Sequence, residues 1–219
     1  MNEYTMLKNH IDTGIHKTTV PLLLLLPILI ITAILAPEHW SLENGIVENS
    51  QLLILIIGII ICCTANHSKS LYYGLATVLF FLCMREINFG RVLFCSKTGQ
   101  FAYCGEPTDY YKWKELPHGP AIRLTLYIIT GIIIAMAVFC KQNYKKVFNI
   151  FTAYKIPMLE LLLAATGAVI SKVIDILKLH YPLPEECAET LMYAAIISAL
   201  YRYTRNLSPF TPTLATPQN

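Results

Sequence analysis

The sequence predicts an all-α membrane protein, a polytopic bundle of about six transmembrane helices. Only 14% of the 219 residues are charged and 55% are hydrophobic, whereas a soluble globular domain carries about 25% charged residues. The hydrophobic residues are gathered in long runs, and a helix of roughly 20 such residues crosses a hydrocarbon core about 30 Å thick. This composition excludes a chain that is disordered throughout. The net charge of +3 is too small and too scattered to indicate nucleic-acid binding.

Six apolar runs account for the predicted spans. The first, 20–36, contains Pro27, which predicts a kink. The second is apolar over 52–65, and because this is too short to cross a bilayer, we extend it backwards past Glu48 to Ile46. The sixth run has the shortest uninterrupted apolar core. The third to sixth runs cover 71–87, 121–140, 156–177 and 188–203.

Lysine and arginine placement predicts the orientation, because these residues are enriched in cytoplasmic loops. The side that carries the N-terminus holds nine of them: Lys8, Lys17, Lys69, Lys141, Lys145, Lys146, Lys155, Arg202 and Arg205. The two short loops of the other side contain only the border residue Lys178. We therefore expect a multi-pass protein of the cell (inner) membrane with both termini inside and the long loop at about 88–120 on the periplasmic or extracellular side. One membrane domain covers 1–205, followed by a Pro/Thr-rich tail at 206–219 that is expected to be disordered.

Two cysteines lie in the predicted outer loop, where the environment is oxidising. Cys95 and Cys104 are expected to form a disulfide that closes a turn through Gly99. Cys187, just before the sixth span, is an alternative partner for either of them. The sequence contains no C-x-x-C pair, which favours a structural bridge over a disulfide-exchange activity. The other cysteines are interpreted as small apolar residues of the spans: Cys62, Cys63, Cys83 and Cys140.

Seven ionisable side chains fall at a similar outer depth on five of the predicted helices: Glu48, Arg85, Glu86, Arg123, Lys172, Asp175 and Glu189. A charge inside a membrane costs several kcal/mol unless it is paired, reaches the interface or faces water. One interpretation is a solvated rim with local ion pairs, such as Lys172 with Asp175 three residues later. The other is a polar cavity that opens outward and holds a headgroup or an ion.

Two short strings surround these charges. E-N-G-I-V-E occupies 43–48 at the head of the second span, and R-E-I-N-F-G-R occupies 85–91 at the end of the third. Together they resemble an uncharacterised group of small polytopic bacterial inner-membrane proteins, over about fifty residues of the chain. Many members of that group carry a second acid where this sequence has Arg85. The resemblance supports placement in a membrane and implies no particular reaction. The matching positions are Glu43, Gly45, Glu48, Glu86, Phe89, Gly90 and Arg91.

The candidate catalytic residues are Glu48, Glu86 and His118, which suit general acid and base roles if they converge. With Glu189 they also suit an oxygen-rich site for a divalent metal. No haem, nucleotide or flavin motif is present. Arginines bind phosphate or carboxylate through two parallel hydrogen bonds, which favours an anionic ligand. The candidate ligand-binding residues are Glu43, Arg85, Asn88, Arg91, Arg123, Lys172, Asp175 and Glu189.

These patterns favour a membrane protein with an outward-facing polar pocket that binds or modifies an anionic lipid or a lipid-linked envelope precursor. A non-catalytic accessory or scaffold subunit of a membrane complex is the alternative, and it would require a partner subunit. A small solute or ion transporter is the third hypothesis. The sequence does not decide whether the protein is an enzyme, and membrane lipid is the partner common to these hypotheses.

Two further expectations concern the helix contacts. The small residues of the fourth and fifth spans are expected to let helices pack closely inside the protein. Glu160 is expected to be isolated and to reach the cytoplasmic interface near Lys155. The small residues are Thr130, Gly131, Ala164, Gly167, Ala168 and Ser171.

Overall fold

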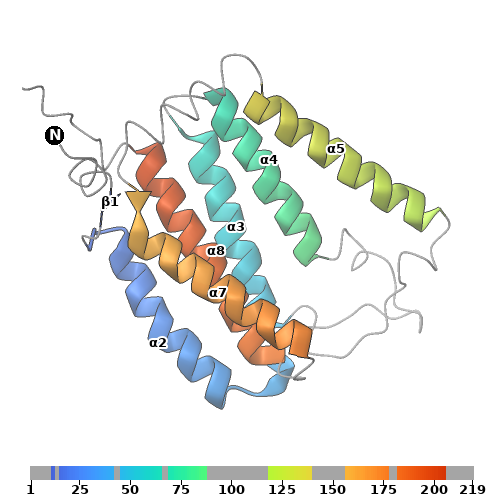
Figure 1. Ribbon diagram of the computed structural model, residues 1–219. Coiled ribbons are helices and arrows are strands. Elements are labelled where there is room, and N and C mark those ends of the chain that lie inside the picture. Colours follow the sequence, from blue (N-terminus) through green and yellow to red (C-terminus); the bar gives the residue numbers. More distant parts are fainter. Residues whose placement is uncertain are drawn as a thin grey trace, which may run out of the picture.

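The computed structural model describes residues 11–12, 15–41, 45–65, 69–87, 118–139, 156–177 and 182–205. Within these residues the fold is a bundle of six α-helices, which confirms the all-α prediction (Figure 1). Each helix coincides with one predicted span. The helices are α2 (Thr19–Leu35), α3 (Ile46–Cys63), α4 (Lys69–Glu86), α5 (Gly119–Phe139), α7 (Met158–Leu177) and α8 (Pro182–Thr204).

The last helix differs most from its prediction, because α8 begins at Pro182 rather than at 188. Proline is favoured in the first turn of a helix, where its missing N–H has no intrahelical partner. The sequence P-L-P-E-E-C therefore starts the helix instead of ending the preceding loop. As a result Glu185 and Glu186 belong to the first turns of α8.

Helix α8 is the centre of the bundle and packs against α2, α3 and α7, while α4 packs on α3 and α5 packs on α4 at the outer edge (Figure 1). It contributes to both hydrophobic clusters, with Tyr193 and Ile197 in one and Leu191 and Ala195 in the other. Because protein surrounds α8, its buried faces include polar residues that a lipid-facing helix would not carry. This burial explains why its apolar core looked short in the sequence.

Large apolar side chains remain on the outside of the bundle. Two stretches are long and apolar enough to cross a membrane, namely His39–Cys63, which contains α3, and Gly119–Met136 of α5. Thr19–Leu35 is a shorter apolar helix. Only 6% of the Gly119–Met136 stretch is buried, unlike the core helix of a soluble protein. The length and apolar composition of the two stretches favour association with a membrane.

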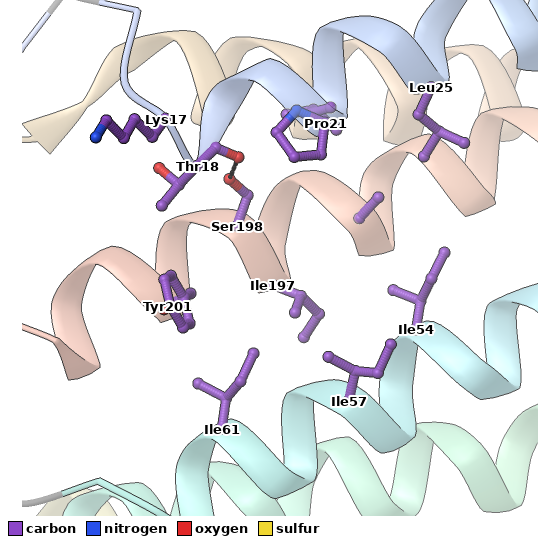
Figure 2. Close-up of a pocket in the computed structure, with 12 residues that line it drawn as sticks. Lys17, Thr18, Pro21, Leu25, Ile54, Ile57, Ile61, Ile197, Ser198 and Tyr201 are labelled. Atoms are coloured by element: carbon purple, nitrogen blue, oxygen red, sulfur yellow. Dashed lines mark hydrogen bonds between the residues drawn. The ribbon is translucent and has the colours of Figure 1, made fainter.

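A groove of about 620 Å³ separates α2 from α3, with α8 as its floor (Figure 2). Ile54, Ile57 and Ile61 form one wall and Pro21 and Leu25 form the other. The lining is therefore almost wholly apolar over about two turns of each helix.

The contact between α7 and α8 depends on small residues. Ala164, Gly167 and Ser171 are buried along α7, and a Cβ atom at Gly167 would lie 2.5 Å from the backbone oxygen of Ala188. The prediction of close internal packing is confirmed at these three positions. It is wrong at Gly131, where a Cβ atom would meet nothing within 4 Å among the described residues.

A buried ion cluster joins four segments, β1 (Ile11–Asp12), α2, α7 and α8, at the end of the bundle where α8 finishes. The carboxylate of Glu160, which is 1% exposed, accepts hydrogen bonds from Arg202 Nη1 (2.9 and 3.0 Å) and from Thr19 Oγ1 (2.7 Å). Arg202 Nη2 also binds Asp12, 2.7 Å away, in strand β1, which pairs in parallel with β2 (Ile156–Pro157). The expectation that Glu160 is isolated is therefore wrong, and its proposed neighbour Lys155 lies outside the described residues.

Candidate functional site

A polar cavity of about 310 Å³ lies at the other end of the bundle, where α3 and α8 begin and α4 ends. We call it the acidic pocket, because five carboxyl groups and a single guanidinium line it among the residues that the structure describes. Its remaining lining residue belongs to the short 3-10 helix η1 (Glu38–Ser41), which packs against α3 and α8. The lining residues are Ser41, Glu48, Arg85, Glu86, Glu185, Glu186 and Glu189.

Helix ends bring the acids to this place. Glu48 lies in the first turn of α3, and Glu185 lies in the first turn of α8. The free N–H groups of a helix N-terminus give it a partial positive charge, which stabilises carboxylates there by about 0.3–1 kcal/mol each. Gly45 precedes α3 in an extended conformation, and its carbonyl accepts a hydrogen bond from the Asn49 side chain (2.9 Å). The two helix starts therefore gather negative charge at one end of the bundle.

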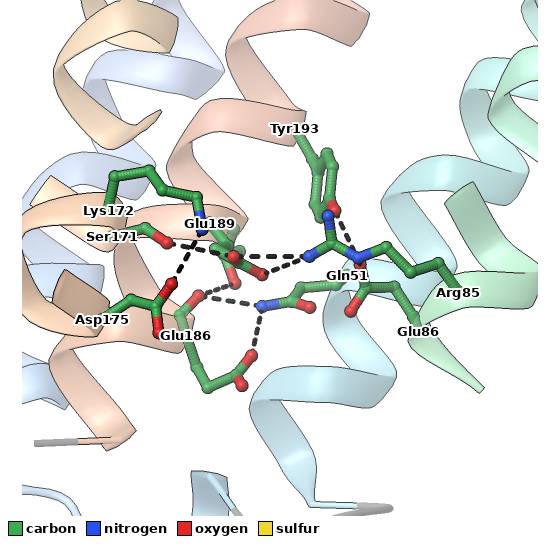
Figure 3. A network of polar contacts seen from close by, with 10 residues as sticks. Gln51, Arg85, Glu86, Ser171, Lys172, Asp175, Glu186, Glu189 and Tyr193 are labelled. Atoms are coloured by element: carbon green, nitrogen blue, oxygen red, sulfur yellow. Dashed lines mark hydrogen bonds and ion pairs between the residues drawn. The ribbon is translucent and has the colours of Figure 1, made fainter. Parts of the chain in front are cut away.

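Gln51 lies beneath the pocket and is fully buried. Its Nε2 donates to the backbone oxygen of Glu186 (2.9 Å) and to Glu186 Oε2 (2.8 Å). Its Oε1 is buried and has no hydrogen-bond partner among the described residues. Figure 3 shows the Gln51 amide between Glu186 and Glu86, with its oxygen directed towards Glu86. A buried acceptor without a donor costs about 1–3 kcal/mol, so this oxygen favours a ligand that donates an N–H or O–H.

Burial raises the pKa of Glu186, which precedes the sixth predicted span, to about 7. The carboxylates of Glu189, Glu86 and Glu48 raise this pKa further, and the hydrogen bond from Gln51 opposes the shift. Glu186 therefore changes its charge near neutral pH.

Arg85 is already shared between two carboxylates of the pocket. Its Nε lies 3.4 Å from Glu86 Oε1, and its Nη2 lies 3.3 Å from Glu189 Oε2. Tyr193 donates a 2.6 Å hydrogen bond to Glu86, and Ser171 donates a 3.0 Å hydrogen bond to Glu189 (Figure 3). These contacts hold both carboxylates in place and pair Arg85 with them. The described part of the pocket therefore carries an excess of negative charge.

Four of the predicted site residues thus meet at the acidic pocket, namely Glu48, Arg85, Glu86 and Glu189. Lys172 and Asp175 form a local pair, with Nζ 2.9 Å from Oδ2, and their side chains are 71% and 56% exposed. This pair does not line the pocket and fits the interpretation of a rim.

Two other candidates lie away from the pocket. Arg123 is exposed on α5, where its Nε donates to the Tyr127 hydroxyl (3.1 Å). His118 is exposed just before α5, in a left-handed backbone conformation (φ 57°). Five predicted positions lie outside the described residues: Glu43, Asn88, Arg91, Cys95 and Cys104.

The sequence reasoning missed Glu185, Glu186 and Tyr193. A helix that starts at Pro182 would have placed Glu186, Glu189 and Tyr193 on one face, because they are spaced by three and four residues. The P-L-P-E-E-C string indicates this helix start, because a proline followed by acidic residues is typical of the first turn of a helix.

The described cysteines Cys62, Cys63, Cys83 and Cys187 are all free. Cys187 is buried and its thiol is free, so its alternative disulfide to the outer loop is not formed. Among the described residues, no three His, Cys, Asp or Glu side chains are arranged to hold a metal ion. The pocket acids thus surround a cavity instead of pointing at one centre.

Comparison of the chain with protein-family models, curated proteins and solved structures finds no match.

Proposed function

We propose that the protein is a multi-pass membrane protein whose acidic pocket binds the headgroup of a lipid or lipid-linked envelope precursor at the outer face of the membrane. Six helices that coincide with six apolar runs support the multi-pass arrangement. The lysine and arginine distribution supports an outer position for the pocket, because Lys17, Arg202 and Arg205 lie at the opposite helix ends.

The charge of the pocket points to the part of the ligand that enters it. Five carboxyl groups surround one arginine that is held by two of them. We therefore propose that an ammonium group enters the pocket, with its N–H groups donated to Gln51 Oε1 and to neighbouring carboxylates. The anionic ligand suggested by the sequence stays a prediction, because Arg91 and Asn88 lie outside the described residues. A zwitterionic headgroup combines both charges. The single observation that carries the proposal is the unpartnered Gln51 oxygen beside Glu86 and Glu186.

An accessory subunit is a second candidate, and α5 favours it. Among the described residues, this helix packs against α4 at the edge of the bundle, and it exposes apolar side chains along its length, including Leu124, Ile128 and Ile132. A partner membrane helix would cover such a face by close packing.

The first test is a headgroup titration. We expect the detergent-solubilised protein to bind dihexanoylphosphatidylethanolamine more tightly than dihexanoylphosphatidylglycerol, measured by isothermal titration calorimetry. Replacement Glu186→Gln removes a charged acceptor, so it should weaken ethanolamine-lipid binding roughly tenfold or more. Asp175→Asn is the matched control, because it neutralises an exposed acid outside the pocket. Tighter binding of the glycerol headgroup would contradict the ammonium assignment.

The same titration should depend on pH. Because the pKa of Glu186 is raised to about 7, this carboxyl is neutral at lower pH and negative at higher pH. Affinity for the ethanolamine headgroup is therefore expected to increase from roughly pH 6 to pH 8. This increase in affinity with pH should be absent in the Glu186→Gln variant. A flat profile in the unmodified protein would show that Glu186 does not contact the cation.

A further inference from the structure

The groove between α2 and α3 is polar at one end only. Lys17, Thr18, Ser198 and Tyr201 lie where α2 begins and α8 finishes, and Leu25, Ile54 and Ala194 lie at the other end (Figure 2). Along α8, Tyr201 follows Ala194 by seven positions, which is about 10 Å of helix. This length is a large part of one leaflet of a bilayer.

The polar end presents hydrogen-bond donors and positive charge. The hydroxyl oxygen of Thr18 is buried without a partner among the described residues, although its backbone oxygen accepts a 3.1 Å hydrogen bond from Ser198. The guanidinium of Arg205 lies over the Tyr201 ring, 5.8 Å from its centroid. Among the described residues that line the groove, Lys17 is the only charged one and none is a carboxylate. The neighbouring Arg202 is neutralised by Asp12 and Glu160.

We propose that this groove binds one acyl chain of an anionic phospholipid, whose phosphate contacts Lys17, Arg205 and the Thr18 hydroxyl. The apolar walls suit the chain, and the two cations with an unused hydroxyl suit the phosphate. The groove is open along one side, since Ile57 is 44% exposed and Tyr201 is 36% exposed. The second acyl chain therefore stays in the surrounding bilayer. This site lies about 20 Å from the acidic pocket along α8 and does not depend on the ligand of that pocket.

Native mass spectrometry of the intact chain in mild detergent tests the proposal. Titration with dioleoylphosphatidylglycerol is expected to give a one-lipid complex at lower concentration than titration with dioleoylphosphatidylcholine. A basic residue near an anionic lipid surface contributes about fivefold to affinity. The double replacement Lys17→Glu and Arg205→Glu should therefore weaken phosphatidylglycerol binding by about tenfold or more. Lys69→Glu is the matched control, because this exposed first residue of α4 lies outside the groove.

A second pair of variants separates the contribution of the apolar groove to lipid binding from the contribution of its polar end. Ile57→Trp fills the groove at an exposed position, and we expect it to weaken binding of both lipids about equally. Thr18→Val keeps the side-chain shape and removes only the hydroxyl, so it should weaken phosphatidylglycerol binding while circular dichroism stays unchanged. Equal affinity for the two lipids, an equal loss in Lys69→Glu, or full binding in Ile57→Trp would overturn the proposal.

Discussion

Replacement of Arg202 by methionine is expected to lower the free energy of unfolding by about 3–5 kcal/mol. The guanidinium is 2% exposed and binds Glu160 and Asp12 at 2.7 to 3.0 Å. Among the described residues, methionine leaves the buried Glu160 carboxylate with the Thr19 hydroxyl as its only remaining donor. A buried charge without its counter-ion is costly, because the low-dielectric interior cannot replace the lost hydration. Reversible unfolding in mixed micelles, followed by circular dichroism, measures the effect.

The comparison variant is Arg123→Met, which removes an exposed arginine from α5 and is expected to change stability little. Adding Glu160→Gln to Arg202→Met should restore part of the lost stability, because the amide removes the unpaired charge. The two sites then show a coupling energy in a double-mutant cycle. If Arg202→Met and Arg123→Met were equally stable, the ion cluster would not stabilise the fold.

The second large effect is expected for Gly167→Ala, which should lower the free energy of unfolding by about 1–3 kcal/mol. The new methyl group would lie 2.5 Å from the backbone oxygen of Ala188 and 3.0 Å from the backbone nitrogen of Met192. Backbone atoms of α8 cannot rotate away as a side chain can, so α7 and α8 must separate. Ser171, one turn along α7, would then lose its 3.0 Å contact with Glu189, and headgroup binding should weaken as well.

Gly131→Ala is the matched control for this substitution. It lies in α5, where the added methyl group meets nothing among the described residues. Alanine favours a helix over glycine by about 1 kcal/mol, so this variant should be neutral or more stable. Opposite signs for the two variants, read from the same unfolding assay, are the expected result. A loss of similar size in both would mean that the α7–α8 contact is looser than described.

The apolar runs predicted where the helices lie, apart from the first residues of α8, because the hydrophobic effect acts on whole stretches of chain. The rotation of each helix about its own axis could not be predicted, because a single sequence does not show which helix faces pack against each other. Arg123 and Glu86 have similar predicted depths, yet Arg123 points away on the edge helix and Glu86 enters the pocket. The pairing of Glu160 with Arg202 joins residues 42 positions apart, and no local pattern marks it.

Helix α8 lines both cavities and can therefore couple ligand binding in one to ligand binding in the other. Glu186 and Glu189 near its start line the acidic pocket, and Ile197 and Tyr201 near its end line the apolar groove. The helix is continuous from Pro182 to Thr204 and is shared by both cavities. If a ligand in one cavity shifts α8 and changes the affinity of the other cavity, thermodynamic linkage requires the reverse effect by the same factor. The lipid composition of one leaflet would then set the headgroup affinity at the other.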